Sequence, residues 1–342
     1  MRLLVASVLA AVTASISWGQ GCVAARLGTP VLSELCGRSD HSKKWSLTVG
    51  YRFQPSSRHF VGTVEQKQRE INNNQIQNTY HLIDFTFERQ LTPRWSVNAT
   101  LPVIFAYRNQ LYAPRGEHQV NGIGDMTAGV HAWVFRPPTE NGGNIGVGIS
   151  LKAPTGRYNV TRPSIDRNGN LINATVDQSI QPGDGGTGFS VDLQAFHPAP
   201  LQTMMYFNAL YLFNPRNTNG VNSYRTRAGE TVLSVTDQYL YRGGISRAIL
   251  GVRGLFVSIG GRMEGVPVRD AFGSSDGFRR PGYAISVDPG FMYQRWGYLF
   301  SCNVPFAVER NRKASVSDYM NRTHGDAAFA DYSLIMSLSK RF

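Results

Sequence analysis

Pairs of histidine and carboxylate residues supply the general bases that activate the nucleophiles of hydrolytic enzymes. His131 follows Asp125 by six positions in an alternating segment, so both side chains should lie on one face of a strand. No serine lies in a recognisable lipase setting. We therefore interpret His131 as a polar contact and predict no enzyme, no cofactor and no metal site. The alternative is a lipid hydrolase or protease built into the wall of a barrel.

A larger set of charged residues alternates with apolar ones and should share a single polar face. This set comprises Lys44, Arg52, Asp84, Glu88, Asp125, His131, Lys152, Asp192, Arg262, Asp288, Asp331 and Arg341. Charges turned into a narrow interior must pair or stay hydrated. Two interpretations remain open: a polar track that selects small solutes, or a ladder of ion pairs that plugs the interior.

The elements that must carry these residues are strands with one apolar and one polar face. In the segment 44–53, one face is small and polar and the other presents Trp45, Leu47, Val49, Tyr51 and Phe53. Segments 94–105 and 144–152 repeat this alternation. A strand between lipid and water requires this pattern.

Alternation predicts about twelve strands, and the connections between them alternate in length. The predicted strands are 44–53, 79–89, 94–105, 124–135, 144–152, 187–197, 201–212, 234–247, 250–263, 282–294, 296–308 and 329–342. The connections after even-numbered strands are short, whereas the six after odd-numbered strands are long. Short periplasmic turns and long extracellular loops give this rhythm. The predicted fold is an all-β, transmembrane, antiparallel up-and-down β-barrel.

Composition and charge agree with an outer-membrane location. The 342 residues include only 17% charged residues, and beyond the N-terminus no apolar run is long enough for a membrane helix. The net charge of +12 comes from basic residues scattered through the predicted loops, so no nucleic-acid partner is expected. Basic outer loops fit contact with membrane lipid and anionic lipopolysaccharide.

The N-terminus reads as a secretion signal over 1–25, with cleavage near 19 or 25. Residues 26–43 would form a periplasmic segment, either inside the lumen or hanging free, and 44–342 the barrel. Cys22 and Cys36 could close a disulfide in the oxidising periplasm if Cys22 survives cleavage. The chain ends on Phe342 within an alternating strand, which resembles the signal recognised by the barrel-assembly machinery.

Three glycine-rich motifs carry a family resemblance. They are Gly122-Ile123-Gly124-Asp125, the stretch 146–156 that ends in Ala153-Pro154-Thr155-Gly156, and Gly183-Asp184-Gly185-Gly186-Thr187-Gly188. The chain resembles a family of Gram-negative outer-membrane barrels described as transporters or as MetA-type, meta-pathway phenol-degradation proteins. The resemblance implies uptake of hydrophobic or aromatic compounds.

Together these observations predict a porin-like barrel that lets small molecules through a narrow charged lumen. The segment 153–186 is the expected constriction or lid, because it is long and rich in Gly, Asn and Asp. Pro289 and Gly290 should bend strand 282–294, where the wall could open sideways. A structural or adhesive barrel with a plugged lumen is the other alternative.

Overall fold

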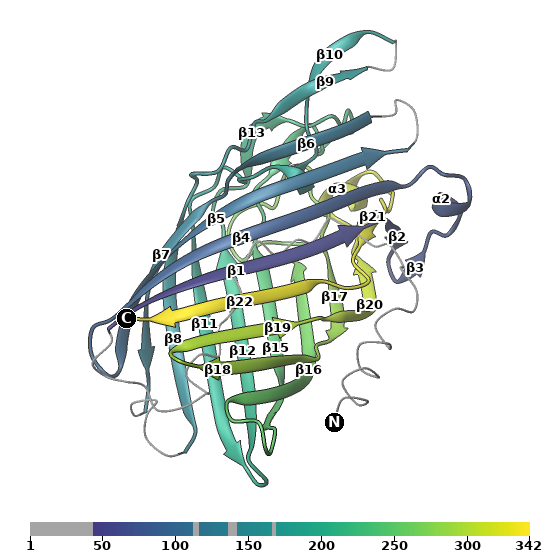
Figure 1. Cartoon of the computed structure of the whole chain (residues 1–342). Coiled ribbons are helices and arrows are strands. Elements are labelled where there is room, and N and C mark those ends of the chain that lie inside the picture. The colour runs from purple at the N-terminus through teal and green to yellow at the C-terminus, as the bar shows by residue number, and fades with distance from the viewer. Residues whose placement is uncertain (1–43, 112–115, 136–141, 166–168) are drawn as a thin grey trace.

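The computed structural model describes residues 44–111, 116–135, 142–165 and 169–342. Within these ranges, twelve strands hydrogen-bond to their neighbours in an antiparallel ring that closes through β15–β16 and β22–β1 (Figure 1). The ring strands are β1 (Trp45–Ser56), β4 (Ile76–Gln90), β5 (Trp95–Gln110), β7 (Met126–Trp133), β8 (Asn144–Ala153), β11 (Gly188–Ala199), β12 (Thr203–Phe213), β15 (Gln238–Ala248), β16 (Leu255–Val266), β18 (Gly290–Arg295), β19 (Tyr298–Asn303) and β22 (Leu334–Arg341). The predicted barrel is confirmed.

Closure explains why an alternating sequence folds this way. A strand edge exposed to lipid would leave backbone N–H and C=O groups unpaired, so only a ring satisfies every strand. The last strand, β22, pairs with the first along Ser46–Phe53, and Phe342 exchanges backbone hydrogen bonds with Trp45. No helix among the described residues is long and apolar enough to cross a membrane.

Three further strands prolong the wall at its outer end, above breaks in the ring strands. They are β6 (Gly116–Ile123), which pairs with the upper part of β5, and β17 (Gly282–Val287) and β20 (Phe306–Arg312), which pair with each other. The long loop expected after strand 94–105 is therefore wrong, because β6 occupies most of it. Glu117, Gln119 and Asn121 face outward and are exposed, so this strand lacks the apolar face that alternation detects.

The strand containing Pro289 is interrupted as predicted, but the wall does not open there. Val287 faces Gly261 and Gly290 faces Ser258, so the pairing register passes the break unchanged. Asp288 N–H donates to the Gly260 carbonyl (2.8 Å), and Val304 N–H donates to the Pro289 carbonyl (3.0 Å). The sideways opening expected at this position is therefore wrong; a bulge lies instead between β17 and β20, beside Val308.

The outer loops that the structure describes are L1 (57–75), L3 (154–187, apart from 166–168), L4 (214–237), L5 (267–281) and L6 (313–333), whereas most of the connection 111–115 lies outside the described residues. Their short elements are β2 (Arg58–Val61), β3 (Val64–Glu65), α2 (Gln68–Ile71), β9 (Thr161–Ile165), β10 (Leu171–Thr175), η3 (Gln178–Ile180), β13 (Thr218–Asn222), β14 (Val232–Ser234), α3 (Val316–Met320) and β21 (Ala327–Phe329). Figure 1 shows these elements gathered at the end of the barrel opposite the chain's C-terminus.

Candidate functional site: the lumen and its loop lid

The lumen differs between its two halves, as the inward-facing residues of β4 and β5 show. Near the periplasmic turns, Thr86, Glu88, Asn98 and Thr100 are only partly buried. Towards the outer end of the same strands, inward residues are buried. These buried residues are Asn78, Tyr80, Leu82, Asp84, Pro102, Ile104, Ala106 and Arg108. On this wall the inner half is accessible to solvent, whereas the outer half is covered.

Loop L3 supplies the cover. Val160, Val176 and Ile180 pack into one apolar cluster with the inward side chains of β4, β5 and β6, among them Leu82 and Ile104. Val176 and Ile180 are each only 1% exposed. Burying such side chains favours the seated loop by about 1.5–3 kcal/mol each. L3 therefore closes part of the outer lumen with a small hydrophobic core.

The three glycine-rich motifs meet at one junction that fixes both ends of L3. The Asp125 carboxylate lies in the break between β6 and β7 and accepts hydrogen bonds from the backbone N–H groups of Gly156 and Asp184, both at 3.0 Å. Lys152 Nζ donates to both oxygens of Asp184, at 2.5 and 2.6 Å. Gly156 and Gly183 touch closely, since a Cβ on Gly183 would lie 2.4 Å from the Gly156 carbonyl oxygen. The motifs thus hold the two ends of L3 together.

Asp177, at the N-terminal end of η3, is the central ionic contact of the lid. It accepts two hydrogen bonds from Arg280 of L5 (2.9 and 2.5 Å) and one from Tyr224 of L4 (2.9 Å). Arg108 of β5 lies 3.3 Å away. Burial alone would raise the pKa of Asp177, but the charges of Arg108 and Arg280 hold that pKa well below its usual value. This latch ties L3 to the wall and to two other loops.

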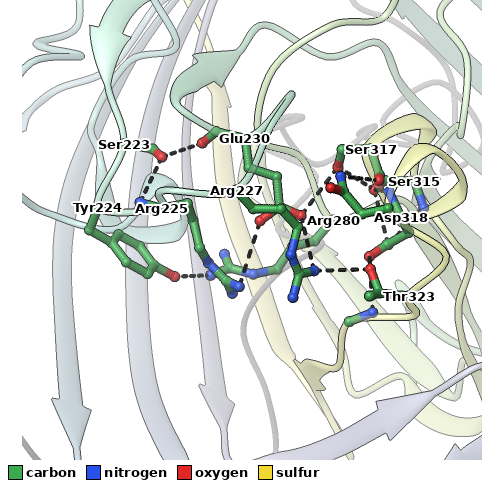
Figure 2. Close-up of polar contacts among 12 residues, drawn as sticks. Ser223, Tyr224, Arg225, Arg227, Glu230, Arg280, Ser315, Ser317, Asp318 and Thr323 are labelled. Atoms are coloured by element: carbon green, nitrogen blue, oxygen red, sulfur yellow. Dashed lines mark hydrogen bonds and ion pairs between the residues drawn. The ribbon is translucent and has the colours of Figure 1, made fainter.

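Loops L4 and L6 are clasped together beside this latch (Figure 2). Glu230 lies 3.7 Å from Arg225 and 3.8 Å from Arg227, and accepts a hydrogen bond from Ser317 Oγ (3.2 Å). Arg227 also donates to Thr323 Oγ1 (3.0 Å). On the L6 side, a capping box between Ser315 and Asp318 starts α3. The clasp is polar and lies in the outer loops, where rearrangement does not require breaking the barrel.

Ion pairs also cross the lumen below the loops. Arg52 of β1 donates to Glu264 of β16 (2.5 Å), which also accepts from Arg262 (2.9 Å). β22, β19 and β18 stand between β1 and β16 in the ring, so this contact bridges strands that are not neighbours. Arg242 donates to Asp288 (2.6 Å), which accepts from Asn303 as well (3.1 Å).

Most of the predicted polar residues face the lumen, as alternation predicted, but they do not all lie together. Facing inward on ring strands are Arg52, Asp84, Glu88, His131, Lys152, Asp192, Arg262 and Arg341, with Asp288 in the β17–β18 break. Lys44 precedes β1 and is exposed. Asp331 precedes β22 and pairs with Arg58 (2.6 Å) and with Arg310. Cys22 and Cys36, like the predicted signal and segment 26–43, lie outside the described residues.

His131 and Asp125, considered above as a possible catalytic pair, have separate surroundings. Asp125 is engaged by L3, whereas the His131 ring lies over Gly146 on β8 and contacts Trp133 edge-on (centroids 5.3 Å apart). One Gly-x-Ser-x-Gly stretch, Gly273–Gly277, escaped the sequence analysis. It lies in L5, without the strand-to-helix turn of a nucleophile elbow, and Ser275 Oγ accepts the Asp270 N–H (2.8 Å).

Sequence reasoning missed the residues that hold L3, namely Arg108, Asp177, Tyr224 and Arg280, and also Glu264, which pairs with Arg52 and Arg262 in the lumen. All except Arg108 and Glu264 are in loops, where alternation gives no direction for a side chain. A weak signal existed in Asp177-Gln178-Ser179, since an Asp two residues before a Ser is typical of a local cap; Asp177 indeed accepts from Ser179 N–H (3.0 Å).

The fold and the location of the site define the class: the protein is an outer-membrane β-barrel with the architecture of outer-membrane channels. Residues 72–197 match the model of the family described as "Putative MetA-pathway of phenol degradation", which confirms the resemblance carried by the glycine-rich motifs. This match covers β4 to β11 and all of the L3 lid with its junction.

Two solved structures share the fold. An outer-membrane channel from Pseudomonas putida F1 aligns with 88% of this chain and 96% of its own, with 11% sequence identity and a TM-score of 0.58. The β-domain of the Bordetella autotransporter BrkA aligns over 88% of this chain and 100% of its own, with 12% identity and a TM-score of 0.50. Among curated proteins, none matches this sequence.

Proposed function

We propose that this barrel is a channel for small molecules across the outer membrane, and that L3 is its lid. The observation that supports this proposal most directly is the packing of L3 in the outer lumen. Its apolar side chains close the outer lumen against Leu82 and Ile104, and ion pairs and hydrogen bonds hold it there. The family match over 72–197 and the shared fold of the Pseudomonas putida channel support this proposal.

The surface under the lid indicates the class of solute. When L3 lifts, the path it uncovers on β4 and β5 presents Tyr80, Leu82, Ile104 and Ala106. Beside this surface the path passes the ion pairs of Arg52, Glu264 and Arg262, since Arg52 is the strand partner of Leu82. An apolar surface flanked by charged groups suits small amphipathic molecules, including aromatic ones, better than sugars or bare ions.

Solute uptake by liposomes containing the purified protein tests the proposal. We expect uptake of small aromatic solutes by wild-type protein and faster uptake by Asp177→Asn, because the neutral amide weakens the pairing with Arg280 and Arg108. Asp276→Asn, an exposed position on L5, is the matched control and should leave uptake unchanged. Uptake no faster than through protein-free liposomes, in both wild type and Asp177→Asn, would favour a structural or adhesive barrel instead.

The hydrolase alternative has its own test. His131→Ala should have the same activity as the wild type on lipid esters and peptides. The reason is that the His131 ring lies over Gly146 and not beside a serine in a nucleophile elbow. Hydrolysis by the wild type that is lost in His131→Ala would replace the channel proposal with an enzymatic one.

A further inference from the structure

Three inward glycines of the ring each lie beneath a polar side chain of a neighbouring strand. A Cβ added to Gly50 would lie 3.2 Å from Asp84 Oδ2, and one on Gly148 would lie 2.1 Å from Asp192 Oδ1. A Cβ on Gly146 would lie 2.4 Å from His131 Cε1. Real Cβ contacts are essentially never shorter than 3.0 Å, and a contact of 3.0–3.4 Å, as at Gly50, is tighter than nine in ten of them. The glycines therefore leave the space in which these side chains lie flat against the wall.

Two of the three side chains meet on the same strand. Gly148 of β8 faces His131 of β7 on one side and Asp192 of β11 on the other. Asp192 covers Gly148, and the His131 ring leans over Gly146. The inward neighbour Ser150 is only partly buried, so this surface borders the open part of the lumen. The Gly-x-Gly spacing of β8 thus makes a shallow floor that holds an imidazole and a carboxylate.

Of these side chains, Asp192 is partly exposed, so its carboxylate is available to a passing solute. Among the residues that the structure describes, Asp84 and Asp192 have no hydrogen-bond or salt-bridge partner, and His131 Nε2 is buried without one. Asp84 is 5% exposed. Elsewhere in the lumen, the carboxylates of Asp184, Glu264 and Asp288 are all paired with bases. Asp84 and Asp192 are therefore set apart from the structural ion pairs.

We propose that Gly50, Gly146 and Gly148 are specificity-determining positions of the channel, and this inference rests on the proposed function. By holding His131 and Asp192 against the wall, Gly146 and Gly148 keep the inner half of the lumen wide enough for a solute, and Gly50 does the same for Asp84 in the covered outer half. The Asp192 carboxylate, which is partly exposed, then faces that solute as a hydrogen-bond acceptor. The path favours solutes with a cationic or hydrogen-bond-donating group over anionic solutes of the same size.

The first test separates the side chain from the glycine beneath it. In Gly148→Ala the new Cβ displaces Asp192 into the lumen, so the uptake of small aromatic solutes by liposomes should fall severalfold. Asp192→Ala in the same chain removes the clash, so the double variant should recover uptake. Gly261→Ala is the control, because nothing lies within 4 Å of its Cβ position and it faces outward. A double variant as slow as Gly148→Ala would overturn the inference.

The second test does not depend on whether Gly148→Ala folds. Uptake of lysine, glutamine and glutamate, which are similar in size and differ in charge, is compared in wild type and in Asp192→Asn, whose amide keeps the shape of the carboxylate. We expect lysine to enter faster than glutamate in the wild type, and the ratio to drop severalfold in Asp192→Asn. An unchanged ratio would overturn the inference while leaving the channel intact. Failure of every solute to enter the wild type would remove the channel proposal and this inference together.

Discussion

At the residue scale, Asp125 shows how one carboxylate can organise a loop. It accepts hydrogen bonds from backbone N–H groups at both ends of L3, and these donors are 31 and 59 residues away along the chain. Alternation correctly indicated its inward direction, but not its partners. The partners come from loop residues whose positions depend on the closed barrel, and no local pattern encodes them.

Asp125→Ala should therefore loosen L3 without disrupting the ring. Two N–H groups lose their acceptor, and Lys152 loses a nearby charge (3.9 Å). An unsatisfied buried donor costs about 1–3 kcal/mol, so we expect a loss of roughly 3 kcal/mol in unfolding free energy. Urea unfolding in detergent measures this loss, with Asp276→Ala as the control. A loss equal to that of the control would show that the junction does not hold L3.

The contact between L1 and L6 gives a prediction about pH. Asp326 accepts a hydrogen bond from His59 Nδ1 (2.8 Å) and lies 2.8 Å from Arg69. Burial raises its pKa, but the hydrogen bond and charge of His59 and the charge of Arg69 outweigh burial and lower the pKa to about 2. A lowered pKa adds stability above the unfolded-state value near pH 4, and this contribution is lost as pH falls towards 2.

The thermal midpoints of wild type and Asp326→Asn should therefore differ most above pH 4 and converge between pH 4 and pH 2. The difference corresponds to roughly 2 kcal/mol at neutral pH. Glu117→Gln, an exposed residue of β6, is the control and should run parallel to wild type throughout. A gap between wild type and Asp326→Asn that persists undiminished at pH 2 would contradict the assignment.

At the element scale, what could be predicted depended on the surroundings of each strand. Within the membrane, lipid on one side and the lumen on the other impose alternation, and the twelve predicted strands overlap those observed. Above the membrane both faces of β6 can be polar, so its segment was interpreted as a loop. The apolar residues Tyr80, Leu82 and Ile104 on the lumen side were not expected either, because they are paired with L3 and not with lipid.

L3 was predicted to be a constriction or lid from its length and composition. The apolar cluster that holds it against the wall was not predicted. Ile180→Ala tests that cluster: removing buried methyl groups should cost about 2–5 kcal/mol locally and increase backbone hydrogen exchange in η3. Ile165→Ala on β9 is the matched control, because Ile165 is 48% exposed. Equal exchange in the two variants would mean that Ile180 does not hold the loop in place.

At the scale of the whole molecule, the barrel has a closed wall, and along β4 and β5 its inner half is accessible to solvent while its outer half is covered by L3. The net charge of +12 does not translate into an anion path, because the bases inside the barrel are paired with acids such as Glu264, Asp288 and Asp177. Charge distribution, which follows from the fold, decides what the lumen presents to a solute.

The most direct test of this account pins the lid with a disulfide. A Cβ on Gly122 would lie 3.6 Å from Cβ of Pro182, a separation that a disulfide can bridge, and Pro182 is two residues from Ile180. In liposomes, the Gly122→Cys/Pro182→Cys variant should take up aromatic solutes at the wild-type rate when reduced, and at the rate of protein-free liposomes when oxidised. Equal uptake in the two redox states would contradict the claim that L3 is the lid.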